Sequence, residues 1–403
     1  MSLSRLKIAI LGRTNAGKSS FLNLITGQDI SITSALEGTT TDIVEKNQEL
    51  PPIGPITWID TAGFGDESEL SVKRLEKTSQ VLDRADMAIL VLEGDKLDTI
   101  EGEIIKKTEE KNIPLIKIFN KKDLFKIEEN GIKVNSTDKN SRDEVLSKLK
   151  RAIIEKAPDD FINQPKLLGD LAPEKSTVIM IVPIDFEAPK GRLILPQVQS
   201  IRDCLDSNQT VIVVKETEYL NTLNNLKSPP ALVVCDSQVV DTMVKETPDN
   251  IKCTTFSILF ARAKGDLNLF VEGAAAISKL QDNDKVLIAE ACTHHASDDD
   301  IGKVKIPNWL KKKTGKILEI DFTSGHDFPE NLEEYKLVVQ CGGCMFNRKE
   351  ILSRVSKCDS HNIPITNYGV CISELKDVLG RVLEPFPEAK AVYERIKNVK
   401  RIA

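Results

Sequence analysis

Short apolar runs alternate with amphipathic stretches along most of the 403 residues. In the first part of the chain, runs of five or six mostly apolar residues read as buried strands. The stretches between them, such as SVKRLEKTSQVLDRA, repeat their apolar positions with the period of a helix. The strand candidates are 6–11, 56–60, 87–92 and 114–119. Strands that alternate with helices predict a mostly parallel sheet with helices on both faces.

The same alternation restarts twice after a polar, proline-containing stretch at 158–176, which we interpret as a linker. The next strand candidates are 177–185, 210–215, 231–236 and 256–261, followed by a third set at 285–291, 316–322 and 335–340. The pattern therefore predicts an α/β protein of three successive β/α domains with mainly parallel sheets. The predicted domains are 1–158, 176–265 and 266–403.

The composition is that of a globular protein, with 40% hydrophobic and 29% charged residues and a net charge of −6. The acidic balance argues against nucleic acid as a partner. No apolar run approaches the roughly 20 residues of a membrane span, so we expect no membrane partner and a cytoplasmic location. In that reducing compartment the eight cysteines are candidates for metal binding, catalysis or the core rather than for disulfides.

The segment GRTNAGKSS (12–20) lies between a predicted strand and a predicted helix. Gly12 and Gly17 permit backbone conformations that aim successive N–H groups at phosphate oxygens. Lys18 can reach the β- and γ-phosphates, and the Ser19 hydroxyl can ligate Mg²⁺. The segment predicts a phosphate-binding loop, so we expect the first domain to be a P-loop G domain.

Further motifs follow in the order that a GTP site requires. WIDTAG ends a strand with Asp60, which can hold the magnesium shell through water, and with Gly63, whose N–H can meet the γ-phosphate. EGTTTD (37–42) supplies a magnesium-sensing threonine. FNKKD contains Asp123, whose carboxylate can accept hydrogen bonds from N1–H and the exocyclic amine of guanine, a donor pair that adenine lacks. These motifs predict GTP and Mg²⁺ as ligands.

Neighbours of these groups complete the predicted nucleotide site. Asn120 would brace the guanine loop, and Ser136 in VNS (134–136) would complete the base pocket. The residues expected to contact GTP are Gly12, Asn15, Ala16, Gly17, Lys18, Ser19, Ser20, Asn120, Lys121, Asp123 and Ser136. The residues expected to act in hydrolysis are Lys18, Thr40, Asp60 and Gly63, with Ser19 and Thr40 on Mg²⁺.

This stretch resembles the bacterial translation-factor-class GTPases of the tRNA-modification and ribosome-assembly group, through Asn15 before AGKSS and Phe64 after DTAG. The resemblance implies that Asn15 helps to hold a K⁺ ion beside the phosphates, where the ion replaces an arginine finger. An apolar Phe64 cannot polarise water, so we expect slow, K⁺-stimulated hydrolysis. Thr40 best matches the magnesium threonine of the group, with Thr39 as the alternative.

Two cysteine-containing stretches in the last domain each follow a predicted strand. One contains Cys292 and His294, and the other, QCGGCM, contains Cys341 and Cys344. Because the carboxyl ends of neighbouring parallel strands converge, these side chains can meet. They are compatible with a redox pair, a zinc site, an iron–sulfur cluster on three thiolates, or burial in a core. The cysteines without a partner at ligand spacing are expected in the core; they are Cys204, Cys235, Cys253, Cys358 and Cys371.

The whole chain resembles the [FeFe]-hydrogenase maturation GTPases. The segments that carry the resemblance are PIDFEAPKGRLILPQVQSIRDCLD, TTFSILFARAKGDL, CTHH, IGKVKIPNWL, CGGCM and PITNYGVCI. The resemblance implies a GTPase domain, a dimerisation domain and a domain that binds a [4Fe–4S] cluster. It places cluster ligation on Cys292, Cys341 and Cys344. His294 or an exchangeable ligand would take the fourth position, because Gln340 stands where some members of this family carry a histidine.

The same resemblance implies a function as GTPase and scaffold. The protein would receive a two-iron precursor from radical-SAM maturation enzymes and deliver it to the apo-[FeFe]-hydrogenase, as a homodimer or higher homo-oligomer. An alternative hypothesis is a K⁺-dependent GTPase of tRNA modification or ribosome assembly with a zinc-stabilised C-terminal domain. A third, a thiol-redox enzyme with a regulatory G domain, leaves Cys292 without a role.

Overall fold

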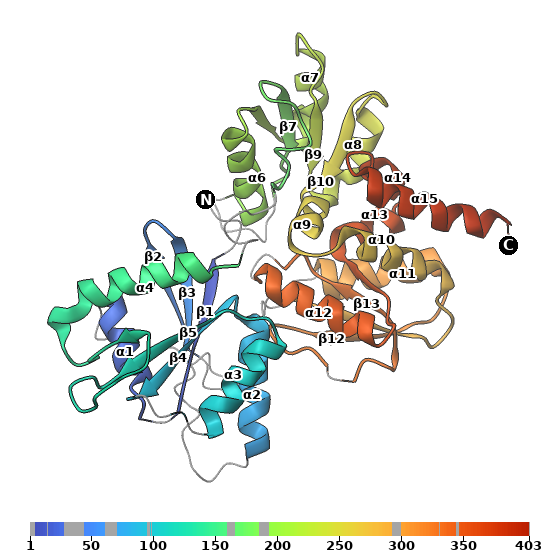
Figure 1. The fold of residues 1–403 in the computed structure, drawn as a ribbon. Helices are drawn as coiled ribbons and strands as arrows, with labels where there is room; N and C mark the ends of the chain where they lie inside the picture. Colours follow the sequence, from blue (N-terminus) through green and yellow to red (C-terminus); the bar gives the residue numbers. More distant parts are fainter. Residues whose placement is uncertain are drawn as a thin grey trace. The chain divides into compact units, whose positions relative to one another are not determined.

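The chain folds as two units, Met1–Gln164 and Pro165–Ala403. The computed structural model describes residues 5–13, 15–27, 44–60, 71–94, 97, 99–158, 166–184, 193–291, 300–329, 331–343 and 346–402. Within these ranges no helix has both the length and the apolar character needed to cross a bilayer. In the same ranges the strands form three mainly parallel sheets, which confirms the predicted α/β class (Figure 1).

The sheet of the first unit runs in the order β2-β3-β1-β4-β5-β6. Its strands are β1 (Leu6–Leu11), β2 (Val44–Leu50), β3 (Gly54–Asp60), β4 (Met87–Glu93), β5 (Leu115–Asn120) and β6 (Ile132–Lys133). Only β2 pairs antiparallel, at the edge beside β3, among the strands described in this unit. The parallel strands therefore present their carboxyl ends, and the loops that follow them, at one edge of the sheet.

Helices cover both faces of this sheet, as the alternation of side chains along β1 shows. Ile8 and Ile10 pack in a core with Phe21 of α1 (Lys18–Thr26) and Val145 of α4 (Arg142–Lys156). Ala9 and Leu11 point the other way, into a core that includes side chains of α2 (Ser71–Arg84) and α3 (Thr99–Glu110). A strand buried on both faces reads as a continuous apolar run, which is why LKIAIL was recognisable in the sequence.

The second unit begins with a parallel sheet in the order β10-β9-β7-β8. Its strands are β7 (Thr177–Ile181), β8 (Thr210–Val214), β9 (Leu232–Cys235) and β10 (Lys252–Thr255). The helices of this region are α6 (Leu195–Asp206), α7 (Tyr219–Asn224), α8 (Val240–Glu246) and α9 (Phe256–Lys264). β8 pairs only with β7 in the described part of the sheet, so it is an edge strand.

The prediction of a strand at 256–261 is wrong, because these residues form most of α9. Thr255 ends β10 and caps the helix, since its hydroxyl oxygen accepts a hydrogen bond from the Ile258 N–H at 3.2 Å. The helix is buried on most of its surface. Such a helix reads as the same short apolar run as a buried strand, and hydrophobic periodicity alone does not separate the two.

The predicted linker at 158–176 is also wrong over its described second half. The N–H groups of Leu168 and Gly169 donate to the Asp203 carboxylate at 2.8 and 2.7 Å, and Gln209 donates to the carbonyl oxygens of Gly169 and Ala172. Leu167 and Leu168 are fully buried. The segment from 166 onward therefore packs into the second unit, and its side-chain partners, which come from distant residues, could not be read from its composition.

The last sheet is parallel, in the order β12-β11-β13-β14. Its strands are β11 (Lys285–Ala289), β12 (Glu319–Thr323), β13 (Tyr335–Gln340) and β14 (Ile365–Asn367). The helices are α10 (Leu267–Ala276), α11 (Ile306–Thr314), α12 (Arg348–Ser360), α13 (Tyr368–Leu375), α14 (Leu379–Val382) and α15 (Pro387–Ile402). β11 and β13 are neighbours, and Ala289 pairs with Gln340. The ends of the two strands that precede the cysteine-containing stretches thus lie side by side, as the sequence predicts.

Candidate functional site

The phosphate-binding loop follows β1 and leads into α1, and its glycines are required by close contacts. Gly12 has φ 141°, and a Cβ there would lie 2.4 Å from the Val91 carbonyl oxygen. Gly17 has φ 92°, and a Cβ there would lie 2.2 Å from Nδ2 of Asn120. Asn15 also takes a positive φ, 64°, which asparagine tolerates better than most residues. The loop is therefore packed directly against the ends of β4 and β5.

Lys18 lies at the start of α1 with 8% of its surface exposed. Its Nζ donates to the carbonyl oxygens of Gly12 and Arg13 at 2.8 and 2.9 Å, so the side chain curls back over the loop. Burial lowers the pKa of the Lys18 ammonium, and the nearby charge of Asp60 opposes this shift. A phosphate group brought to the loop would favour the charged form in the same way.

Asn120, at the end of β5, connects the two walls of the nucleotide pocket. Its Nδ2 donates to the Ala16 carbonyl oxygen at 2.9 Å, and its Oδ1 accepts from the N–H and the hydroxyl of Ser136 at 3.1 and 2.8 Å. Both Asn120 and Ser136 are buried. Ser136 therefore lies beside the guanine-type motif and lines the pocket, and its contact with the base stays a prediction.

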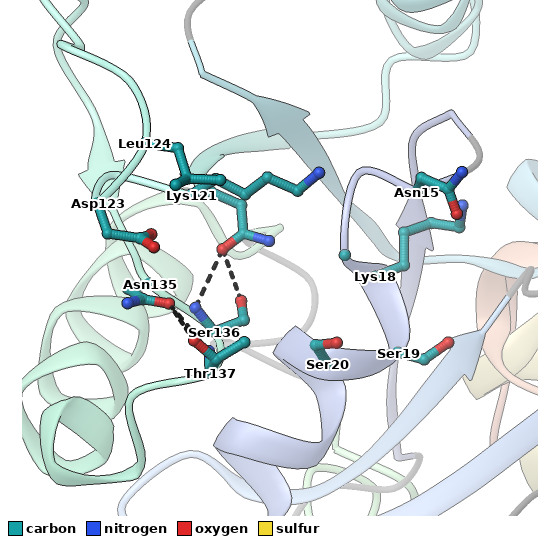
Figure 2. A pocket seen from close by; sticks show the side chains of 12 residues that line it. Asn15, Lys18, Ser19, Ser20, Lys121, Asp123, Leu124, Asn135, Ser136 and Thr137 are labelled. Carbon is teal, nitrogen blue, oxygen red and sulfur yellow. Dashed lines mark hydrogen bonds between the residues drawn. The ribbon is translucent and has the colours of Figure 1, made fainter.

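Figure 2 shows the pocket that these elements enclose, which has a volume of about 560 Å³. One wall comes from the phosphate-binding loop and the start of α1, with Asn15, Gly17, Lys18, Ser19 and Ser20. The other comes from the loops after β5 and β6, with Asn120, Lys121, Asp123 and Ser136. Gly12 packs against the backbone of Val91, and Ala16 is fully buried. The volume is in the range of small-molecule sites.

One group in this region, Glu93, was missed in the sequence, and a second, Asn135, was expected only as a neighbour of Ser136. The carboxylate of Glu93, at the end of β4, lies 2.5 Å from Nζ of Lys121 and 3.7 Å from a guanidinium nitrogen of Arg13, so it joins the guanine-type loop to the phosphate loop. Asn135 lines the pocket and accepts hydrogen bonds from the N–H and hydroxyl of Thr137. For Asn135, the order Asn-Ser-Thr at 135–137 was the feature of the sequence that indicated a turn at this place.

The predicted magnesium and switch residues are only partly described. Ser19 is exposed in the first turn of α1, and Asp60 is buried at the end of β3. Thr40 and Gly63 lie outside the described residues, as do Cys292, His294 and Cys344 of the predicted cluster site. Within the described ranges, no three His, Cys, Asp or Glu side chains gather as for a metal ion.

Cys341 directly follows β13 and joins the two cysteine-containing stretches. Its N–H donates to the Ala289 carbonyl oxygen at 2.8 Å, and its sulfur accepts from the N–H of Ala291 at 3.0 Å and of Gly343 at 3.4 Å. Ala291 immediately precedes Cys292. Backbone N–H donors aimed at a sulfur stabilise a thiolate, which is the form that binds metals. The donor chemistry therefore fits a soft metal or iron–sulfur group.

Buried polar side chains surround Cys341. Gln340 is 1% exposed, and its amide oxygen has no hydrogen-bond partner among the residues that the structure describes. Glu290, 4% exposed at the end of β11, accepts from the Tyr368 hydroxyl at 3.1 Å. Burial, followed by the charges of Glu290 and Cys341, raises the pKa of Tyr368, so the phenol remains a donor. A buried oxygen without a partner is costly, which fits a site that accommodates a further group.

The other cysteines are in the core, as the sequence predicts. Burial raises the pKa of Cys204 and Cys358 to about 12 and of Cys253 to about 11. It also raises the pKa of Cys235 and Cys371. All five thiols are buried and stay protonated at neutral pH.

Comparison with known proteins separates the two units of the chain. Residues 167–265 match the hydrogen maturase F dimerization domain, and residues 268–385 match the hydrogen maturase F tetramerization domain. The chain belongs to the hydrogen maturase F family. Residues 7–121 match the 50S ribosome-binding GTPase family, so the chain carries an N-terminal GTPase domain.

Individual relatives match the GTPase domain. The chain is 37% identical over 126 residues to GTPase Der of Kosmotoga olearia and 41% identical over 123 residues to tRNA modification GTPase MnmE of Prochlorococcus marinus. Each match covers 30% of this chain and 28% or 26% of the relative, so the chain spans about a quarter of the length of these curated relatives. The G domain of the T. maritima FeoB iron transporter aligns over 38% of this chain and 99% of its own, at 20% identity and a TM-score of 0.28.

Proposed function

We propose that this protein is a GTP-hydrolysing scaffold that assembles the two-iron precursor of the [FeFe]-hydrogenase active site. The hydrogen bond from the Ala291 N–H to the Cys341 sulfur carries this proposal. It joins the two cysteine-containing stretches at one sheet edge, in a region that matches a domain of this family. The precursor would come from radical-SAM maturation enzymes and pass to the apo-hydrogenase.

Cys292, Cys341 and Cys344 would hold a [4Fe–4S] cluster, with His294 or an exchangeable ligand in the fourth position. When bound, the cluster supplies an iron whose replaceable ligand can give way to the two-iron cargo. The protein's own contribution is visible at Cys341, where two backbone N–H groups orient the sulfur. Glu290 and Gln340, at the ends of β11 and β13, are both buried.

GTP would bind in the pocket of the first unit, with Mg²⁺ on Ser19 and Thr40 and with Asp60 behind it. Asp123, which lines the pocket, would read the guanine edge. K⁺ would bind at Asn15, which is exposed at the phosphate end of the pocket. Lys18 would leave the carbonyl oxygens that it now contacts and pair with the phosphates.

The scaffold would act as a homo-oligomer, in keeping with the dimerization and tetramerization domains that it matches. The edge strand β8 exposes Val213 (43%), and the preceding helix α6 exposes Val198 (47%) and Leu205 (56%). Large apolar side chains exposed together on an edge strand and its neighbouring helix are typical of an interface. We therefore assign the dimer contact to a second copy of β8 and α6.

Anaerobic reconstitution tests the function. The full chain should bind about four iron ions with matching sulfide. Cys341→Ser should lose iron and keep GTP hydrolysis, Lys18→Ala should lose hydrolysis and keep iron, and the core variant Cys204→Ala should keep both. A colourless protein that takes one zinc ion would refute the scaffold. Binding of tRNA or ribosomal subunits on filters would favour a translation-related GTPase instead.

A further inference from the structure

A buried lysine from one family domain contacts the cysteine loop of the other. Lys264 is the last residue of α9 and is 4% exposed. Its Nζ donates to the carbonyl oxygens of Gly343 at 3.0 Å and Phe346 at 2.9 Å. These two carbonyl groups lie on either side of Cys344 in the chain. A single ammonium group therefore binds both ends of the loop that contains a predicted cluster ligand.

The ends of this loop have a defined local structure. The Phe346 N–H donates to the Gly343 carbonyl oxygen at 3.0 Å, which closes a turn. Gly343 has φ 60°, which favours glycine, and a Cβ there would lie 2.5 Å from Cδ1 of Ile351, so the end of that side chain would have to move. Asn347 then caps α12 by accepting from the Glu350 N–H at 3.1 Å. Lys264 thus binds Gly343 and Phe346, which a backbone hydrogen bond also joins to each other.

A second contact ties the same two elements together. The guanidinium of Arg348, the first residue of α12, donates to the Ala263 carbonyl oxygen at 2.7 Å. α9 and α12 also pack against each other (Figure 1). The end of α9 is therefore joined to the ends of the cysteine loop through Lys264 and to the start of α12 through Arg348.

The chemistry of Lys264 indicates more than packing. Burying an ammonium group is unfavourable unless it is hydrogen-bonded, and a methionine of similar length would fill the space without that cost. The ring of Phe260 lies 5.4 Å from the ammonium and adds a weak attraction. What the lysine supplies, and methionine cannot, is a set of donors for the two carbonyl groups.

We propose that Lys264 is a positioning residue that holds the Cys341–Phe346 loop in the conformation that binds the cluster. The cluster itself rests on the function proposed above. Lys264 lies in the region that matches the dimerization domain, and the loop lies in the region that matches the tetramerization domain. The region that matches the dimerization domain therefore contributes Lys264 to the cysteine site. The positive charge of the Lys264 ammonium makes reduction of a bound cluster easier.

The test uses the full chain, and one of its measurements is made on protein that carries no cluster. In the cluster-free protein, alkylation of Cys341 and Cys344 by iodoacetamide is followed by peptide mass spectrometry. Lys264→Met should raise the rate about ten-fold, because loss of the hydrogen bonds to Gly343 and Phe346 frees the backbone on either side of Cys344 and beside Cys341. In the reconstituted protein, Lys264→Met should release iron to a chelator about ten-fold faster, as loss of outer-shell support usually does, and should lower the cluster's reduction potential.

The matched control is Lys252→Met, on the exposed surface of the strand before α9, which should stay within about two-fold in both assays. Rates for Lys264→Met that equal those of this control would overturn the proposal. Should Lys264→Met fail to fold, as judged by lost GTP hydrolysis and aggregation, Arg348→Gln is measured in the same assays with the same criterion. A wild-type chain that takes no cluster would refute the scaffold function, while the alkylation rates would still decide the role of Lys264.

Discussion

Replacing Asn120 by alanine tests whether one side chain holds the two walls of the nucleotide pocket together. Asn120 is 2% exposed and makes three hydrogen bonds, to the Ala16 carbonyl oxygen and to the N–H and hydroxyl of Ser136. Each buried bond contributes about 1 kcal/mol, and the groups left unpaired add to the loss, so the expected cost is about 2–4 kcal/mol.

This cost should appear in nucleotide affinity. The loops released by Asn120→Ala must be ordered again when GDP or GTP binds, so the binding free energy falls by the same amount. A loss of 2–4 kcal/mol corresponds to affinity that is about 30- to 1,000-fold weaker. Titration with a fluorescent GDP analogue measures it directly, on the full chain at fixed Mg²⁺ and K⁺.

Asn135→Ala is the matched control. Asn135 lines the same pocket, but its Oδ1 accepts hydrogen bonds from Thr137, two residues along the same turn. Removing the Asn135 side chain should weaken the nucleotide binding free energy by about 1 kcal/mol, which is about five-fold in affinity. If the two variants weaken binding equally, or if Asn120→Ala binds within five-fold of the wild type, the side chain does not hold the walls together and our reasoning is wrong.

Three further predictions follow from other parts of the chain. Replacing K⁺ by Na⁺ should slow GTP hydrolysis, and Asn15→Ala should remove the difference; equal rates in both salts would exclude the K⁺ role. Leu205→Glu on α6 should give monomers in light scattering, whereas Leu97→Glu, which is also exposed but in the first unit, should not; an intact oligomer would refute the β8–α6 interface. Because burial raises the pKa of Cys358 from 9.0 to about 12, its stabilising effect is complete below pH 9 and is lost as pH rises to 12. Between pH 9 and 12, the free energy of unfolding in urea should therefore fall more steeply in the wild type than in Cys358→Ala. The difference between the two slopes should be up to about 1.4 kcal/mol per pH unit, and equal slopes would contradict this.

The strands and the loops that follow them could be predicted because they obey local rules. Apolar runs such as 87–92 are strands, and the phosphate-loop glycines lie where a strand meets a helix. Each cysteine-containing stretch follows a predicted strand, and groups at the carboxyl ends of neighbouring parallel strands converge. This rule predicted that the ends of β11 and β13 could meet, and the two strands are neighbours. Each of these inferences needs only a window of sequence and the order of elements.

Long-range partners could not be predicted in this way. Nothing around Glu93 indicates that its carboxylate will lie between Lys121 and Arg13. The segment 166–172 has a loop-like composition, yet Asp203 and Gln209 supply its hydrogen bonds. At 256–261 a helix that is buried on most of its surface reads as a short apolar run, which conceals the helical period. These contacts depend on tertiary packing, which composition and periodicity do not encode.

The misread helix α9 is also the element on which the two matched domains meet. α10 begins at Leu267, so Gly265 and Asp266 alone separate it from Lys264. A Cβ on Gly265 would lie 2.4 Å from the ring of Phe270, and Asp266 caps α10 by accepting from the N–H groups of Asn268 and Leu269. A junction this short and this closely packed does not absorb movement of α9. If the function proposed above holds, we expect a shift of α9 on assembly to reach Gly343 and Phe346, on either side of Cys344, through Lys264.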